Sequence, residues 1–232
     1  MTDVRETLAR LNPAGVRFDS GRGGAPALTN QDIAAALAFV PAGVGRELLV
    51  ACWWPDAAAI RSVALRDAVY EHIRPEVVRQ TRDLVDARVR LGMVRARAGW
   101  TETLDAETRR ELAAAEAALD AAKVRCWPSA TWEMLPVLTR AVVSEIAMPN
   151  HCPSCRGLRD VRAPSGLLVP CKTCGGNGVV SVSDRKRAEA IGRDESTYRG
   201  AWRPVYEWLL SELRDAEQAA ARSLRDALAV RG

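Results

Sequence analysis

The chain has 232 residues, of which 48% are hydrophobic and 27% charged, a composition typical of a soluble globular protein with one or two packed domains. The net charge of +4 excludes a polycation, so any contact with nucleic acid must come from a local patch. No apolar run reaches the roughly 20 residues of a membrane span, and the polar residues 1–6 do not predict a signal peptide. We expect a cytoplasmic protein, and a mainly α-helical one because its valines are scattered.

The N-terminal part predicts a flexible segment over residues 1–28, because residues 17–27 are rich in glycine and proline. Thr29 is then expected to cap a helix that Pro41 ends. The apolar run over residues 46–54 closes with Trp53 and Trp54. Two tryptophans can form a stacking platform, but beside an apolar run we expect them in a core.

The middle of the chain predicts two long helices, over residues 57–97 and 103–125, joined near Gly99. Pro75 is expected to interrupt the first of them. Their apolar spacing predicts a helical hairpin or coiled-coil arm over about residues 77–125, within a helical domain that spans residues 29–150. Arginines crowd the first helix, and we interpret them as a solvated face rather than a nucleic-acid contact.

A further helix is expected before residue 149. Ser129 is its predicted N-cap, Pro136 lies in its interior, and Pro149 ends it. Pro136 is expected to kink this helix, because proline removes an intrahelical hydrogen bond.

Two cysteine pairs predict a zinc finger over residues 151–180. Their spacing, C-x2-C-x15-C-x2-C, lies in the range of structural zinc sites. The alternatives are four unrelated reduced thiols, or two disulfides in an oxidising compartment. Each cysteine pair would lie on a tight turn, called a zinc knuckle. Glycines just after each pair favour zinc, because the backbone of a knuckle needs positive φ there. Four thiolates leave no coordination position open, so we expect one structural zinc ion on Cys152, Cys155, Cys171 and Cys174.

Residues 181–232 predict a helix-turn-helix and a C-terminal helix. Ser183 caps a short helix, Gly192 breaks it, and Asp194 caps the next. The first residues of such a second helix enter the major groove, and neighbouring cations can grip phosphates. An ordinary helical hairpin with a solvated basic face is the alternative. The predicted DNA-binding residues are Arg185, Lys186, Arg187, Arg193, Ser196, Thr197, Arg199 and Arg203.

The end of the chain carries a heptad-like apolar stripe after Pro204. Such a stripe is suited to packing or to a partner helix. Its members are Leu209, Leu213, Ala220, Leu224 and Leu228.

The order of these features resembles the antitermination protein Q family of phage lambda and its relatives. Similar stretches are residues 29–37, the glycine turn at 43–47, the knuckles that begin at Cys152 and Cys171, and residues 197–206 (TYRGAWRPVY). The resemblance covers residues 29–56 and about 130–228. Arg159 stands where the family has a second glycine, and the segment at about 57–128 has no counterpart.

This resemblance implies a sequence-specific DNA-binding regulator from a phage or prophage, acting in the cytoplasm of a bacterial host. Such proteins bind double-stranded DNA near a late promoter, engage RNA polymerase holoenzyme paused downstream, and let it read through terminators. One or two protomers on the DNA are both compatible with the sequence.

Two other classes of protein share some of these features. A repressor or activator without antitermination activity would have the same DNA-binding end. A zinc-ribbon chaperone accessory of the DnaJ type shares the knuckles, but it needs four such repeats and this chain has two. We do not expect an enzyme, because His72 and His151 form no plausible catalytic dyad with any thiol.

Overall fold

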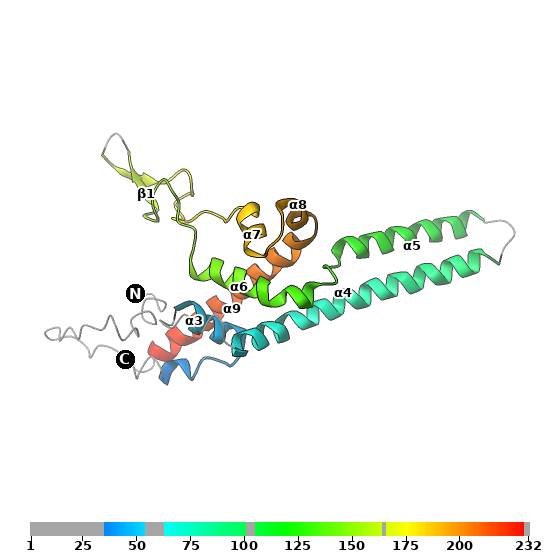
Figure 1. The fold of residues 1–232 in the computed structure, drawn as a ribbon, viewed down its shortest axis with the longest axis horizontal. Helices are drawn as coiled ribbons and strands as arrows, with labels where there is room; N and C mark the ends of the chain where they lie inside the picture. The colour runs from blue at the N-terminus through cyan, green and yellow to red at the C-terminus, as the bar shows by residue number, and fades with distance from the viewer. Residues whose placement is uncertain (1–34, 54–62, 101–104, 164–165, 230–232) are drawn as a thin grey trace. The chain divides into compact units, whose positions relative to one another are not determined.

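The computed structural model describes residues 35–53, 63–100, 105–163 and 166–229 (Figure 1). These residues are mainly α-helical, as predicted, with a two-stranded antiparallel sheet. The predicted flexible segment at residues 1–28 and the N-cap at Thr29 lie outside the described residues. None of the helices that the structure describes combines the length and apolar character that crossing a membrane requires.

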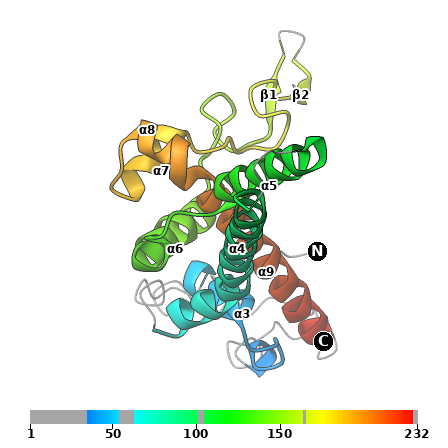
Figure 2. The ribbon, with the colours of Figure 1, turned by 90° about the vertical axis from the view of Figure 1, so that its right-hand side faces the viewer.

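The chain divides into two compact units, one of residues 70–133 and one from residues 1–69 and 134–232. The element labels are those of Figures 1 and 2. In chain order the elements are α3 (Val44–Trp53), α4 (Val63–Ala98), α5 (Ala106–Arg125), α6 (Thr131–Ala147), β1 (Asp160–Arg162), β2 (Leu168–Pro170), α7 (Asp184–Ala190), α8 (Glu195–Thr197), η2 (Tyr198–Trp202) and α9 (Arg203–Ala229).

Residues 70–133 form the predicted helical hairpin, in which α4 and α5 run side by side (Figure 1). Near the tip, Arg95 pairs with Glu116 at 2.9 Å. At the base, the Trp127 N–H donates to Gln80 Oε1 at 2.9 Å. Few of the described side chains of this unit are buried, and they are Ile73, Gln80 and Leu91 in α4, Ala115 and Ala122 in α5, and Thr131. A narrow apolar seam with ion pairs on its flanks therefore holds the two helices together.

The interruption expected at Pro75 is wrong, because α4 is one continuous helix from Val63 to Ala98. Proline has no N–H, so the Glu71 carbonyl loses its intrahelical donor. Pro75 and Glu71 are both exposed, so water can take the place of that donor. Solvation lowers the cost of the missing hydrogen bond, and the helix continues through the proline.

The N-cap predicted at Ser129 is also wrong, because α6 begins later, at Thr131. Residues 129–130 form a turn. The Thr131 N–H and hydroxyl both donate to the Pro128 carbonyl, at 2.9 and 2.6 Å. The helix then runs through Pro136 to Ala147.

The core of the other unit lies where α3 packs along α9. The predicted C-terminal stripe is buried at all five of its positions. Ala220, Leu224 and Leu228 pack with Val40 and Leu49 in one apolar cluster. Trp53 packs against this cluster, and its indole N–H donates to Glu217 Oε1 at 2.9 Å. The core position predicted for Trp53 is therefore confirmed, and Trp54 lies outside the described residues.

Gly45 allows α3 to approach α9 closely. A Cβ at position 45 would collide with the backbone carbonyl of Ala216 and crowd the Ala220 side chain. Backbone cannot move aside as a flexible side chain can, so the contact depends on the missing Cβ. In α4, a Cβ at Gly92 would meet no atom within 4 Å.

We predict that Gly45→Ala destabilises the protein by about 1–3 kcal/mol, because overpacking against the Ala216 carbonyl outweighs the gain in helix propensity. Gly92→Ala is the matched control and should stabilise by up to about 1 kcal/mol, because alanine favours the helix and fits without contact. Urea unfolding followed by circular dichroism measures both changes. Equal effects of the two substitutions would contradict the close approach at Gly45.

Candidate functional site

The four predicted ligand cysteines come together in one buried cluster. Cys152 and Cys155 precede β1, and Cys171 and Cys174 follow β2, so the β1–β2 hairpin folds one pair onto the other. The Sγ–Sγ distance is 3.8 Å between Cys152 and Cys171, and 3.7 Å between Cys155 and Cys174. All four Sγ atoms lie within 4.8 Å of one another. The cluster can therefore hold a metal ion.

The spacing of the sulfur atoms fits a tetrahedral metal centre. A zinc–sulfur bond of about 2.3 Å places tetrahedral sulfurs about 3.8 Å apart. The two closest pairs match this edge length. The donor set is all sulfur and all buried, which suits a soft or borderline cation and leaves no ligand position for a substrate. His151 is exposed, with its ring against Gly157, and it is not part of the cluster.

Backbone hydrogen bonds lock the two knuckles together. The Cys152 N–H donates to the Gly178 carbonyl at 2.9 Å, and the Gly178 N–H donates to Cys174 Sγ at 3.2 Å. Gly178 has a φ of 78°, and a Cβ there would lie 2.8 Å from the Gly157 carbonyl oxygen. Arg159 also has a positive φ, of 69°, at the place where the resembled family has glycine.

The surroundings of the sulfurs favour the thiolate unequally. The Cys174 backbone N–H lowers the pKa of the Cys171 thiol to about 7. The Cys155 backbone N–H likewise lowers the pKa of Cys152. Burial instead raises the pKa of Cys155 to about 11. A bound cation is therefore needed to keep all four sulfurs ionised near neutral pH.

The second predicted site is built on α7 and the helical run that begins with α8. Ser183 caps α7 by accepting from the Lys186 N–H, and Asp194 caps α8 by accepting from the Thr197 N–H at 2.8 Å. Between them, Gly192 has a φ of 66° and ends α7. Its N–H and that of Arg193 donate back to carbonyls of α7, at 3.0 and 2.9 Å. The helix boundaries predicted here are confirmed.

A π-turn over Tyr198–Trp202 joins α8 to α9, and the sequence did not predict it. The Arg203 N–H donates to the Tyr198 carbonyl, five residues back instead of four. The wide turn keeps the Pro204 ring from crowding the Gly200 carbonyl, whereas α4 and α6 accommodate Pro75 and Pro136 without such a turn. Tyr198 and Trp202 are both buried on the inner side of this run.

Arg187 is not available for the predicted phosphate contact. Its side chain is buried, and its guanidinium donates to both Glu145 oxygens, at 3.0 and 2.7 Å. Burial opposes the charge on Arg187, but the bonds to Glu145 outweigh it and raise the guanidinium pKa. The Tyr206 hydroxyl donates to Glu145 at 3.0 Å, and Arg187 lies over the Tyr206 ring. Arg187 therefore binds α7 to α6 and α9.

Sequence reasoning missed the partner of Arg187. Glu145 is a single carboxylate in the apolar stretch at residues 141–146 of α6, and it is buried. A lone charge among apolar positions of a helix is the signal that could have found it, because such a charge needs a buried partner.

The other seven predicted DNA-binding residues are exposed on α7, on the turn and on the run from α8 into α9. Some of them already have partners. Arg199 pairs with Asp184 at 3.0 Å and with Glu195 at 2.5 Å. Arg203 pairs with Glu207 at 2.9 Å. The Thr197 hydroxyl donates to Asp194 at 2.6 Å. Among the described residues, no ion pair engages Arg185, Lys186 or Arg193, so no carboxylate neutralises these three cations.

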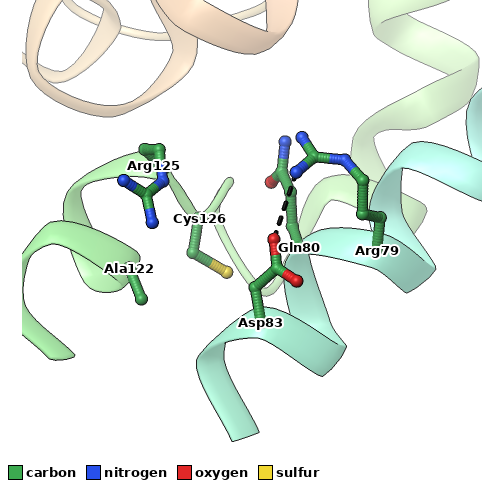
Figure 3. Close-up of a pocket in the computed structure, with 6 residues that line it drawn as sticks. All are labelled: Arg79, Gln80, Asp83, Ala122, Arg125 and Cys126. Carbon is green, nitrogen blue, oxygen red and sulfur yellow. Dashed lines mark hydrogen bonds and ion pairs between the residues drawn. The ribbon is translucent and has the colours of Figure 1, made fainter. Parts of the chain in front are cut away.

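A small hollow lies at the base of the α4–α5 hairpin (Figure 3). In Figure 3, Arg79 reaches toward Asp83, and Cys126 points toward α4. The hollow has room for about one water molecule, so it offers no space for an organic substrate. Its lining residues are Arg79, Gln80, Asp83, Ala122, Arg125 and Cys126.

Comparison of the chain with protein-family models, with curated proteins and with solved structures finds no match in any of the three.

We predict one tightly bound metal ion per chain, released together with much of the finger's fold on chelation, because binding energy at such a site is folding energy. Cys171→Ser should act like chelation, whereas Cys52→Ser, in α3, should keep the metal. Protons compete with the metal for every protonated thiol, so metal affinity should fall more steeply with decreasing pH below the Cys171 pKa of about 7, where this thiol is protonated as well as Cys155. Elemental analysis of reduced protein measures the content, and a metal-free, folded finger would contradict the prediction.

We predict that Arg187→Ala lowers the free energy of unfolding by about 2–4 kcal/mol, because it removes two hydrogen bonds and the nearer cation from buried Glu145. Among the described residues, Glu145 then keeps only Arg214, at 3.5 Å, as a cation, and the Tyr206 hydroxyl. Arg185→Ala, two residues away on the exposed side of α7, should change it by about 0.5 kcal/mol or less. Urea unfolding compares the two variants. Equal stability of the two would show that the Glu145 carboxylate does not need Arg187.

Proposed function

We propose that the chain is a zinc-stabilised, sequence-specific DNA-binding protein that acts as a transcription antitermination factor of a phage or prophage. The observation that carries the DNA-binding part is the capped helix pair of α7 and α8. Its inner side is fixed by the Arg187–Glu145 ion pair, and the start of its second helix exposes Ser196, Thr197 and Arg199.

Zinc is the metal that best suits the finger. Four buried thiolates in a C-x2-C pair arrangement are the ligand set of structural zinc sites. The cysteines fill the coordination shell, so the ion stabilises the finger and takes no part in catalysis. We propose a non-enzymatic role for the chain, because neither of its two histidines is expected to form a catalytic dyad with a thiol.

The helix pair is proposed to bind DNA as a helix-turn-helix. The start of the second helix would lie in the major groove, where Arg can bind guanine through two hydrogen bonds and Ser or Thr can reach a base or a phosphate. Arg185, Lys186 and Arg193 would contact the phosphate backbone from the first helix and the turn. Arg199 and Arg203 would exchange their carboxylate partners for DNA on binding.

Antitermination rests on the resemblance of the two knuckles and of residues 197–206 to the lambda Q family. In this proposal the protein binds DNA near a late promoter in the bacterial cytoplasm and then modifies RNA polymerase so that it passes terminators. A repressor or activator would need only the first of these two activities.

We predict that Lys186→Ala weakens binding to all duplexes alike. It should also reduce the magnitude of the slope of log affinity against log salt concentration by about 0.9, the contribution of one phosphate contact. Arg199→Ala should instead weaken binding to the cognate site by about tenfold to a hundredfold and relax preference at one base pair. Fluorescence anisotropy on cognate and scrambled duplexes separates the two effects. If both variants change specificity equally, the second helix does not lie in the groove as proposed.

We predict that the wild-type protein raises the fraction of run-off transcripts that pass a terminator downstream of its cognate late promoter. The template with a scrambled binding site is the control and should show no increase. Tight DNA binding without any read-through would instead identify a plain transcriptional repressor or activator.

A further inference from the structure

The finger exposes apolar side chains that its metal centre does not use. Leu158, Leu167 and Leu168 are 76%, 68% and 69% exposed. The apolar residues that pack against the four cysteines are different ones, Val161 and Val180. Exposed leucines in a two-stranded hairpin are typical of a contact surface. Covering them with a partner removes apolar surface from water, which is favourable.

The segment that carries these leucines is also rich in cations. Residues 151–180 contain four basic residues and one acidic residue, Asp160. Arg162 lies directly across the strand pair from Leu168, and Asp160 lies across from Pro170. Within the described chain, no ion pair engages any of the four basic residues. We call the leucines and these cations the finger patch: Leu158, Leu167, Leu168, Arg156, Arg159, Arg162 and Lys172.

The helix pair differs in part. Its Arg187, Arg199 and Arg203 are bound to carboxylates of the same chain, whereas Arg185 and Lys186 are in no ion pair among the described residues. In the finger patch none of the four cations is neutralised in this way, and exposed leucines lie in the same segment. A phosphate backbone would match the cations but not three exposed leucines. An acidic protein segment with apolar side chains would match both, since charges steer the encounter and buried apolar groups hold the complex.

We propose that the finger patch is a protein-docking surface for an acidic partner segment that also offers apolar side chains. This inference rests on the proposed function in one respect: the segment is taken to belong to bacterial RNA polymerase. Among the described residues the β1–β2 sheet has two strands, so each strand also has an outer edge along which an extended partner segment can pair.

The test uses the full chain with its metal bound and measures affinity for three probes at the same salt concentration. The probes are bacterial RNA polymerase, a cognate DNA duplex and vesicles of anionic phospholipid. One variant removes the apolar anchors, Leu167→Ser with Leu168→Ser, and one reverses the charge, Arg159→Glu with Arg162→Glu. The matched control is Val85→Ser with Val89→Ser, which removes two exposed apolar residues from α4. Metal content and thermal unfolding verify that each variant is folded.

We expect both finger variants to bind polymerase at least about tenfold more weakly, with DNA affinity unchanged within about twofold and no binding to vesicles. The α4 control should bind like wild type. Read-through should fall for the finger variants in parallel with polymerase affinity, and this includes the single change Arg162→Glu.

Three results would overturn the inference. If the finger variants bind polymerase like wild type while read-through persists, the docking surface lies elsewhere and the proposed function stands. Loss of DNA or vesicle affinity in the finger variants would identify a nucleic-acid or lipid surface instead. If wild-type protein binds DNA but neither binds polymerase nor gives read-through, antitermination fails and the docking proposal fails with it.

Discussion

The Glu145 carboxylate imposes the constraint on which the DNA-binding proposal depends. A buried carboxylate is unfavourable unless donors surround it, and Glu145 draws its donors from two other helices. Arg187 supplies two hydrogen bonds from α7, and Tyr206 supplies one from α9. Because these bonds hold the inner side of α7 against α6 and α9, they also fix the direction in which its exposed side points. Residues that would meet DNA owe their orientation to a charge pair that DNA never touches.

The finger solves the problem of stability differently. About thirty residues cannot bury enough apolar surface to form a core of their own, and its few buried side chains are mostly cysteines. A metal ion can replace that core, because its bonds to four sulfur atoms hold the two knuckles together and supply folding free energy. With a metal ion bound to the cysteines, the fold of this segment would not need the apolar residues of the hairpin, and these can face outward. In α9, by contrast, the leucines of the stripe are buried against the rest of its unit.

Local signals in the sequence predicted much of this arrangement. Ser183, Gly192 and Asp194 act through hydrogen bonds and dihedral angles within a few residues, so their roles as caps and stop follow from the sequence alone. The cysteine pairs are also local signals, and the hairpin between them brings them together. Pro75 was misjudged because the cost of a proline in a helix depends on whether water reaches the freed carbonyl, which sequence does not reveal.

The role of Arg187 could not be predicted for a related reason. It directly follows two exposed cations, Arg185 and Lys186, and looks like a member of the same basic cluster. Its true partner lies 42 positions away in sequence, on a different helix. The order of charged residues in the sequence does not show which of several neighbouring cations points into the protein. That choice depends on helical phase and on a carboxylate brought near by the tertiary fold.

The π-turn at residues 198–202 has a consequence for how such a protein can diverge. A π-turn is equivalent to one extra residue inserted in an α-helix, and one residue corresponds to a rotation of about 100°. Deleting Gly200 would remove that extra residue and rotate the run before it by this angle relative to α9. Tyr198, which is fully buried, would then leave the core, and Ser196 and Arg199 would turn with it. Relatives of this chain are therefore expected to keep the number of residues between Tyr198 and α9, and to vary exposed residues such as Ser196 instead.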